Sequence, residues 1–500
     1  MVIKLRNSYW LETYKKPNVK RKKLIKKTDI LIIGAGITGI STAYSLKDIG
    51  KKVTVVEALE VGSGVTAYTT AKVTVLHGAL LSKIRDLHGI DVANLYFKSQ
   101  IEAFNLIKNI IKKENIDCDF KHEDAYVYAS TDEEVAKLEK EWEILKEIDS
   151  NVELVSITPL PKDIIKAIKY KNNATFHPLK YVARLAEIIQ EAGVNIYENS
   201  RVVDISLEDG NYMVEMECGA VINSEIVVVA THYPIKKFSG LYFTKLIQER
   251  SQAVAFKTRK VIPGMYINIK EPIRSYRSIN EKTMIMGGCS TDVGESISTN
   301  YYEELKKAVS VYDKEATILN EWSTEDCMPV DYVPFIGKYA LTTPNLYVAT
   351  GFQKWGMTNS HVAALTIKRD ILELDNLYKE LYNPTRFSHL RGIIHFGEYL
   401  AKIIDGLVIT KLTYPEDIEQ SIEIGSGKVI NNQDGKNVAI YRTSKDEFLY
   451  FKPNCTHLGC GINWNDLDKT WDCKCHGSRF SPDGKVLNDP AYEPLEKFEN

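Results

Sequence analysis

The sequence has no long hydrophobic run and no surplus of charge of either sign. No apolar stretch reaches the roughly 18 residues that a membrane-spanning helix needs, and residues 1–10 hold no signal-peptide core. The 64 Lys and Arg residues balance 66 Asp and Glu residues, for a formal net charge of -2. This balance creates no global field that would attract nucleic acid. We therefore expect neither a membrane span nor a nucleic-acid partner.

Cysteine is scarce as well, at eight in 500 residues. Half of these cysteines lie between residues 455 and 475, and the others have no spacing that suggests pairing. The four isolated cysteines are Cys118, Cys218, Cys289 and Cys327. Sparse, unpaired cysteine is typical of a reducing compartment, which predicts a cytoplasmic protein.

One basic stretch stands out at residues 20–27, ahead of the first apolar segment. Such runs contact nucleic acid or a membrane surface in some proteins, but a solvated arm explains this one more simply. We therefore expect residues 1–27 to form an N-terminal arm. The length of the chain predicts about two to four folded modules in all.

Two short Cys/His boxes near the C-terminus carry the strongest chemical signal. The first reads Cys-Thr-His-Leu-Gly-Cys at 455–460, and the second reads Cys-Lys-Cys-His-Gly-Ser at 473–478. Thiolates are soft ligands that suit an iron–sulfur cluster, and two imidazoles on one iron raise its potential. The alternative is a zinc site, but the boxes hold more Cys and His than a tetrahedral zinc site needs.

Roughly the final eighty residues resemble the Rieske [2Fe–2S] proteins of cytochrome bc complexes. The resemblance implies that two thiolates hold one iron and that two imidazoles hold the other. The four ligands that it implies are Cys455, Cys473, His457 and His476. It also implies a disulfide between Cys460 and Cys475, which would join the two cluster loops.

The residues after the second box depart from the pattern of the high-potential Rieske proteins. Those proteins place a Ser and a Tyr there as hydrogen-bond donors to the cluster sulfurs, whereas this chain has Ser478 and Phe480. Because one donor is missing, less negative charge is offset in the reduced cluster. We predict a potential below that of the respiratory proteins.

A nucleotide-binding motif lies at the other end of the chain. An apolar strand at 29–33 runs into Gly-Ala-Gly-Ile-Thr-Gly at 34–39, followed by a helical stretch and a second strand that ends at an acid. This is the βαβ dinucleotide fingerprint in its full context, and the acid accepts from the ribose hydroxyls, which disfavours NADP. The residues it predicts to bind the nucleotide are Gly34, Gly36, Thr38, Gly39 and Glu57.

Two further segments favour FAD over NAD. The loop at 62–67 and the distant segment at 331–358 resemble the flavin-binding elements of the D-amino-acid oxidase and glycine oxidase superfamily. A helix that begins near Gly356 would direct its N–H groups at the flavin edge where negative charge collects on reduction. The further flavin-binding residues that the resemblance implies are Ser63, Thr66, Val203, Thr231, Gly337, Gly351, Gly356, Met357 and Thr358.

The resulting fold prediction is an α/β FAD-binding Rossmann-type domain, an α+β substrate domain and a small all-β Rieske domain at the C-terminus. The FAD-binding domain is predicted to be discontinuous, at 28–80, 170–235 and 323–377. The substrate domain takes 81–169 and 236–322. A linker at 378–418, with an amphipathic helix at 393–407 that packs on the FAD domain or touches a membrane surface, leads to the Rieske domain at 419–500.

The whole chain resembles a bacterial family of FAD-dependent oxidoreductases of this superfamily that carry a C-terminal Rieske domain. The stretches at 8–10 and 69–73 also fit this family. A flavin takes two electrons as a hydride, whereas a cluster accepts electrons singly. We therefore expect a dehydrogenase that oxidises an amine, amino acid or similar small molecule and passes electrons to an acceptor protein or quinone-like molecule. The alternatives are an oxidase, a flavin reductase fed by NAD(P)H, and a redox sensor.

Several residues are candidates for the substrate pocket. Lys354 and Trp355 precede the flavin-facing helix, where relatives place a substrate contact. Carboxylate binding is the role considered for three residues of the substrate domain, namely Arg274, Tyr276 and Arg277. His77 and His177 could orient an amine or a proton. A surface or packing role is the competing explanation for all of these except Lys354.

Overall fold

The computed structural model describes residues 6–14, 16, 23–235, 239–294, 300–386, 419–431, 435–475, 477–488 and 490–498. The amphipathic helix expected at 393–407 and the expected ligand His476 lie outside these residues. Among the described helices, none is both long and apolar enough to cross a membrane. This finding agrees with the absence of a long hydrophobic run.

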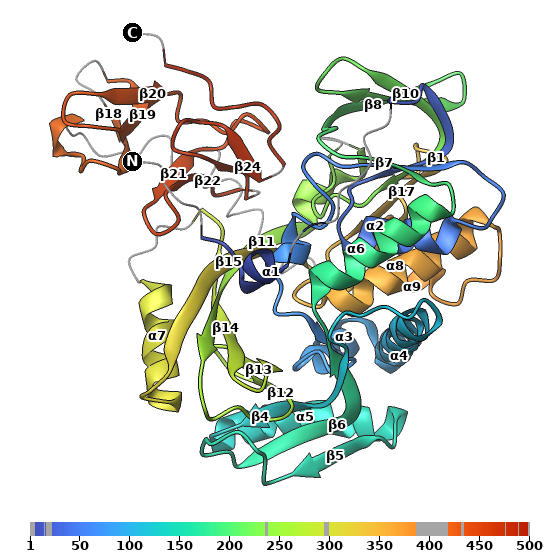
Figure 1. Cartoon of the computed structure of the whole chain (residues 1–500), viewed down its shortest axis with the longest axis vertical. Coiled ribbons are helices and arrows are strands. Elements are labelled where there is room, and N and C mark those ends of the chain that lie inside the picture. Colours follow the sequence, from blue (N-terminus) through green and yellow to red (C-terminus); the bar gives the residue numbers. More distant parts are fainter. Residues whose placement is uncertain are drawn as a thin grey trace.

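An eight-stranded sheet with the order β16-β17-β10-β1-β2-β7 forms the nucleotide-binding part, and β9 and β8 extend it beyond β10 (Figure 1). Its strands are β1 (Lys27–Ile33), β2 (Val53–Val56), β7 (Asn195–Tyr197), β8 (Val202–Glu208), β9 (Asn211–Met216), β10 (Val221–Val229), β16 (Phe335–Lys338) and β17 (Leu346–Thr350). Strand β1 pairs in parallel with both β2 and β10. Ile30, Leu31 and Ile32 of β1 are fully buried, which explains why this strand reads as a continuous apolar run.

Helices cover one face of this sheet. Helix α2 (Ile37–Leu46) follows β1 directly and packs against α8 (Gly356–Ile371) and α6 (Pro178–Glu191). Helix α4 (Ile90–Lys113) contacts α8 as well, beside α3 (Leu80–His88) and the short α9 (Lys379–Tyr382). The strand–helix–strand unit therefore forms as predicted, and three segments distant in sequence build one nucleotide-binding layer.

A nine-stranded sheet with the order β15-β11-β14-β13-β12-β4-β6-β3, and with β5 beside β6, forms the second part. Its strands are β3 (Lys72–Val73), β4 (Lys121–Ala129), β5 (Val152–Val155), β6 (Lys166–Thr175), β11 (Leu246–Lys257), β12 (Met265–Asn268), β13 (Arg274–Asn280), β14 (Thr283–Asp292) and β15 (Thr317–Pro329). Helices α5 (Asp132–Ile148) and α7 (Tyr301–Tyr312) pack on it. The expected boundaries at 169/170 and 322/323 fall inside β6 and β15, so these strands connect the two parts.

The N-terminal segment is anchored more firmly than a solvated arm would be. Helix α1 (Tyr9–Thr13) buries Trp10, whose indole N–H donates to the Thr69 carbonyl at 2.7 Å. The Ser8 hydroxyl donates to the carbonyl of Ala67, in the 3-10 turn η1 (Val65–Ala67). Part of the expected arm therefore supports the loop that the sequence assigns to the flavin.

The Rieske part is all-β, as predicted. A three-stranded sheet contains β18 (Gly427–Asn431), β19 (Asn437–Arg442) and β20 (Phe448–Phe451), after the 3-10 turn η4 (Glu419–Ser421). A four-stranded sheet contains β21 (Ile462–Asn465), β22 (Thr470–Cys473), β23 (Arg479–Phe480) and β24 (Val486–Asn488). Cys460 and Cys475 form a disulfide that joins the two loops carrying the Cys/His boxes, as the resemblance implied.

Candidate flavin and cluster sites

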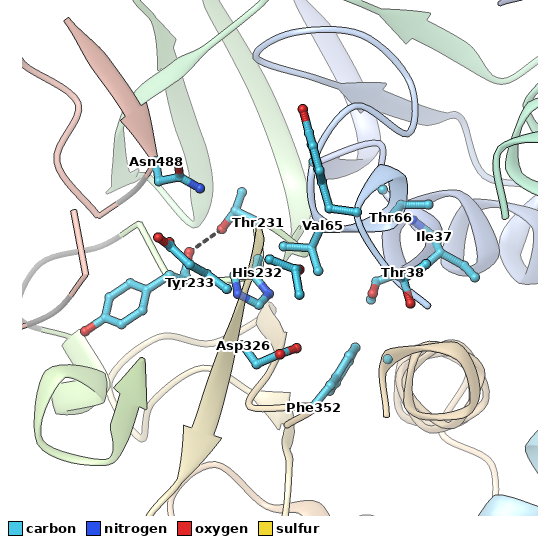
Figure 2. Close-up of a pocket in the computed structure, with 18 of the residues that line it drawn as sticks. Ile37, Thr38, Val65, Thr66, Thr231, His232, Tyr233, Asp326, Phe352 and Asn488 are labelled. Atoms are coloured by element: carbon cyan, nitrogen blue, oxygen red, sulfur yellow. Dashed lines mark hydrogen bonds between the residues drawn. The ribbon is translucent and has the colours of Figure 1, made fainter. Parts of the chain in front are cut away.

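A cavity of about 320 Å³ lies between the nucleotide-binding sheet and the nine-stranded sheet. Its walls come from the β1–α2 turn, the end of β2, η1, the β17–α8 loop and strands of the second sheet. In Figure 2 Asn488 lies at one side of this cavity, opposite Thr38 and Thr66. The cavity therefore reaches from the fingerprint to the C-terminal domain.

The glycines of the fingerprint are required by close backbone approaches. Gly34 has φ +103°, and a Cβ there would lie 2.5 Å from the Ala230 carbonyl oxygen. A Cβ on Gly39 would lie 1.9 Å from the Gly34 carbonyl oxygen. Larger residues would push α2 away from β1, and the N-terminus of α2 could not face the cavity as a phosphate-binding site.

The acid at the end of β2 is held by the backbone around it. Glu57 accepts from the Ala35 N–H at 2.7 Å and from the Leu59 N–H at 2.9 Å, and burial raises its pKa. The Thr66 hydroxyl oxygen accepts from the Ile37 N–H at 3.0 Å, at the start of α2. These bonds fix the fingerprint and the 62–67 loop to one another, in an arrangement that fits a dinucleotide.

Most of the predicted flavin-binding residues line this cavity. Those that do are Gly34, Gly36, Thr38, Glu57, Ser63, Thr66, Thr231, Gly351, Gly356 and Met357. The exceptions are Gly39, Val203, Gly337 and Thr358. At β8 the lining residues are Arg201 and Val202 instead of Val203, and Gly337 packs against Pro384. The N-terminus of α8 faces the cavity, where its dipole would favour negative charge on a reduced flavin.

Of the substrate-pocket candidates, Lys354 and Trp355 line the cavity. The Lys354 ammonium lies 2.9 Å from a carboxylate oxygen of Glu249. The Trp355 ring stacks on His77 with centroids 4.5 Å apart and an interplanar angle of 8°. His77 is buried behind Trp355, and burial lowers its pKa to about 3, so it acts as a neutral support for the ring.

The three expected carboxylate-binding residues on β13 do not line the cavity. Successive residues of a strand point to opposite faces, and Ser275 is the one on β13 that faces the cavity. Arg274 pairs with Glu304 at 3.4 Å on the other face, and the Tyr276 ring lies 6.3 Å from Tyr312. Arg277 is buried and donates to the carbonyl oxygens of residues 70 and 71. Arg277 thus fixes the 69–73 stretch.

The remaining histidine candidate also lies outside the cavity lining. His177 caps the N-terminus of α6, and its ring packs 4.9 Å from that of Trp10. Burial lowers the pKa of His177 to about 4. The structure therefore gives His177 a local packing role beside the N-terminal segment.

Several ionisable residues of the cavity were not identified from the sequence, among them Lys72 and Asp326. Lys72 is half-buried in the cavity wall, and its ammonium donates to the Ser275 hydroxyl at 2.9 Å. Burial, with Arg277 nearby, lowers the pKa of Lys72 to about 7. Burial raises the pKa of Asp326 to about 7. Lys72 belongs to the 69–73 stretch noted above, but only its burial reveals a role.

His232 is a further missed residue of the cavity wall. It has φ +68°, burial lowers its pKa to about 4, and its Nε2 has no hydrogen-bond partner among the described residues. In Figure 2 the next residue, Tyr233, lies on the side of the C-terminal domain. Leu487, Asn488 and Tyr492 of that domain also line the cavity.

The two Cys/His loops bring two of the expected ligands, Cys455 and Cys473, close to each other. Cys455 and Cys473 are both buried, and the neighbouring Cys473 lowers the pKa of Cys455, as does the Ser478 hydroxyl. The His457 backbone N–H donates to the Cys455 sulfur at 3.4 Å. N–H and O–H donors around sulfur suit thiolates that bind a metal cluster. The ligand set itself stays a prediction, since His476 is outside the described residues.

The residues after the second box allow a test of how the cluster is tuned. Phe480 is fully buried in β23, and Ser478 is buried beside Cys455. Phe480→Tyr should raise the midpoint potential of the cluster by adding a donor, whereas Ser478→Ala should lower it. Redox titration followed by EPR would measure both. Unchanged potentials in both variants would show that neither side chain acts on the cluster.

The fold and the site together define a flavin-dependent oxidoreductase joined to a Rieske iron–sulfur domain. Residues 29–369 match the family described as FAD dependent oxidoreductase, and residues 416–499 match the Rieske [2Fe-2S] domain. The chain belongs to this family of FAD-dependent oxidoreductases and carries a C-terminal Rieske domain. Its cofactors are accordingly FAD and a Rieske [2Fe–2S] cluster.

Similar proteins share one or both parts. The chain is 34% identical over 498 residues to YhfW of Bacillus subtilis, a Rieske 2Fe-2S iron-sulfur protein, covering 98% of this chain and 97% of the relative. L-proline dehydrogenase from P. horikoshii superposes with a TM-score of 0.61 at 23% identity, covering 73% of this chain and 98% of that one. Glycine oxidase from Geobacillus kaustophilus gives a TM-score of 0.61 at 16% identity, covering 73% and 100%.

We predict that the FAD is bound without a covalent link. The candidates for a covalent link are Cys327 and His77, and neither lines the cavity. Cys327 is buried with its sulfur 3.6 Å from the His232 carbonyl oxygen. Acid precipitation should release all of the yellow flavin into the supernatant. Flavin that stays with the denatured protein would contradict this prediction.

Proposed function

We propose that this protein is a dehydrogenase that oxidises a small amine or amino acid at FAD and passes the electrons through the Rieske cluster to an external acceptor. The observation that carries the proposal is the shared wall of the flavin cavity. Leu487, Asn488 and Tyr492 of the Rieske domain line a cavity otherwise built by the FAD-dependent oxidoreductase fold. A flavin in this cavity would lie next to the domain that holds the cluster.

The cavity offers suitable groups for such a substrate. Lys72 and Lys354 supply cations that could bind a carboxylate, and Asp326 supplies a carboxyl group whose pKa of about 7 suits proton exchange with an amine. Ile267, Ile273 and Phe352 supply apolar surface. Bound FAD supplies the hydride-accepting chemistry. Two similar structures belong to enzymes named for amino acids, proline and glycine, which supports the choice of substrate class.

Three other functions fit less well. An oxidase that delivers electrons to O₂ would leave the cluster without a role. A flavin reductase fed by NAD(P)H would need a second nucleotide site, but the sequence has no second G-x-G-x-x-G after a strand. A redox sensor would not need a cavity with ionisable residues suited to a substrate. We propose that the external acceptor is a protein or a quinone-like molecule. We also propose that the protein acts in the cytoplasm.

Anaerobic reduction of the flavin tests the proposal. The oxidised protein is mixed with a panel of amino acids, secondary amines and polyamines, with NADH and NADPH as the competing donors. We expect at least one amine or amino acid to bleach the flavin absorbance and then to produce the EPR signal of the reduced cluster. Reduction by NADH or NADPH alone, with no response to any amine, would overturn the proposed direction of electron flow.

A further inference from the structure

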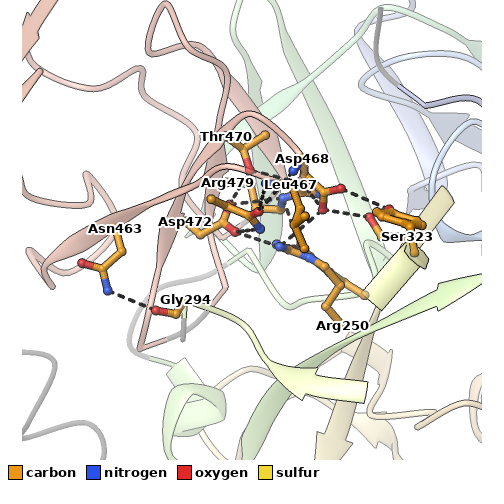
Figure 3. A network of polar contacts seen from close by, with 12 residues as sticks. Arg250, Gly294, Ser323, Asn463, Leu467, Asp468, Thr470, Asp472 and Arg479 are labelled. Atoms are coloured by element: carbon orange, nitrogen blue, oxygen red, sulfur yellow. Dashed lines mark hydrogen bonds and ion pairs between the residues drawn. The ribbon is translucent and has the colours of Figure 1, made fainter. Parts of the chain in front are cut away.

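A buried network of charges connects the Rieske domain to the nine-stranded sheet (Figure 3). Its centre is Arg250 of β11, whose side chain is 2% exposed. The guanidinium donates to Asp472 of β22 at 2.8 Å and to Glu325 of β15 at 2.8 Å. A single arginine of the oxidoreductase part therefore bonds carboxylates on both sides of the domain boundary.

A second arginine completes the network from the Rieske side. Arg479 of β23 lies 3.1 Å from Asp468, 3.3 Å from Asp472 and 3.4 Å from Glu325. The Asp472 carboxylate is thus contacted by both arginines, Arg250 at 2.8 Å and Arg479 at 3.3 Å. Glu325 also lines the flavin cavity, which means that the network reaches the cavity wall.

Neutral side chains and the backbone add further contacts across the same interface. Tyr302 and Ser323 of the oxidoreductase part donate to Asp468 at 3.1 and 3.2 Å, and the Asn463 amide donates to the Gly294 carbonyl at 3.2 Å. The backbones also approach closely, because a Cβ on Gly294 would lie 2.3 Å from the Cα of Lys474. The interface is therefore specific in geometry as well as in charge.

The docked orientation turns the cluster loops toward the flavin cavity. A Cβ on Gly477, in the second box, would lie 2.6 Å from the Gln248 side chain, which lines the cavity. The ring of His457 lies 6.4 Å from that of Tyr233, the residue that follows His232 in the cavity wall. The expected cluster ligand His457 is therefore next to Tyr233, a residue of the cavity wall.

We propose that the five-residue network of Arg250, Glu325, Asp468, Asp472 and Arg479 is a docking latch that fixes the Rieske domain where its cluster receives electrons from the flavin. This inference rests on the proposed function. The reduced flavin loses two electrons and two protons, the protons leave to solvent, and each electron reduces one cluster iron from ferric to ferrous. An external one-electron acceptor reoxidises the cluster between the two transfers.

The variant that tests the latch is Asp468→Ala. It removes the contacts to Tyr302 and Ser323 and leaves two arginines opposite two carboxylates, so no charge is orphaned. Arg250→Met would instead leave three carboxylates with one arginine and could prevent folding. The matched control is Asp466→Ala, in the same loop, whose carboxylate contacts Lys469, Trp464 and Ser426 within the Rieske domain.

Two measurements on the full-length holoprotein are needed. Hydrogen exchange reports whether amides of β11, β21 and β22 at the interface stay protected. Photoreduction of the flavin, followed by the absorbance of flavin and cluster, reports electron transfer without any substrate. In Asp468→Ala we expect faster exchange at the interface and transfer slowed about tenfold, in proportion to the lost docked population. Asp466→Ala should match the wild type in both.

Three results would overturn the inference. Interface amides that stay protected in Asp468→Ala would show that the network does not hold the domain. Loss of protection with transfer at the wild-type rate would show that docking is not needed. Equal effects in Asp466→Ala would indicate a general weakening of the loop. Failure of the proposed function looks different, because the wild type would then keep a protected interface yet transfer no electrons from photoreduced flavin to the cluster.

Discussion

Cys455→Ser is expected to leave flavin reduction by substrate intact. The rate of electron transfer to a one-electron acceptor should fall more than about 100-fold, which exceeds the loss typical when a hydrogen-bond partner of a metal ligand is replaced. The two half-reactions separate because Cys455 lies in the Rieske domain, whereas the proposed site of hydride acceptance is the cavity lined by the fingerprint and α8. Stopped-flow absorbance of the flavin and steady-state reduction of a ferric acceptor would measure the two rates.

The matched control is Cys218→Ser, at an exposed free cysteine of the nucleotide-binding part. This variant should keep its iron and both rates. If Cys455→Ser loses flavin reduction as well, while it stays folded with FAD bound, the cluster would be structural or part of the substrate site. The model in which electrons leave through the cluster would then be wrong.

Lys72→Met is expected to lower kcat/KM for an anionic substrate by about 10- to 100-fold, the loss typical of one hydrogen bond to a charged group. Lys72 is a half-buried amine of the cavity wall, and its ammonium reaches Ser275 at 2.9 Å. Because the pKa of Lys72 is about 7, the wild-type kcat/KM should fall as the pH rises above 7. The variant should lack this pH dependence, and Lys72→Arg should retain most of the activity.

The same variant should be more stable than the wild type. Burial lowers the pKa of Lys72 from 10.5 to about 7, so between these values the unfolded chain binds a proton that the folded chain does not. Stability of the wild type therefore rises with pH across this window, and the cost of burying the cation is complete below pH 7. The gain in Tm from Lys72→Met should be largest at pH 6, shrink as the pH rises from 7 and vanish only above pH 10.5. A lower Tm at pH 6 would contradict the assignment of a buried, destabilising cation.

Local patterns were sufficient to predict the two cofactors. The strand, the glycine turn and Glu57 are contiguous in sequence, and the backbone geometry of Gly34 and Gly39 leaves little choice of residue. The Cys/His boxes are equally local, so the disulfide between Cys460 and Cys475 was within reach of a family resemblance. In both cases the motif lies within one continuous stretch of sequence, 29–57 or 455–478.

The residues that face the substrate part of the cavity could not be predicted in the same way. Whether a residue of β13 faces the cavity depends on the register of the strand, and a shift of one residue exchanges Ser275 for Arg274 or Tyr276. Lys72 and Asp326 are ordinary charged residues until tertiary packing removes them from water. The network around Arg250 joins residues more than 200 positions apart, a contact that no local pattern encodes.

The flavin cavity is lined in part by Leu487, Asn488 and Tyr492 of the C-terminal domain, and this has a consequence for assembly. A ribosome completes both ends of the nucleotide-binding fold before it makes these residues, because the family match ends at residue 369 and the Rieske match begins at 416. During synthesis FAD can enter a cavity that is still open on that side. Once the last strands dock, the protein's own C-terminal domain forms part of the wall around the flavin cavity.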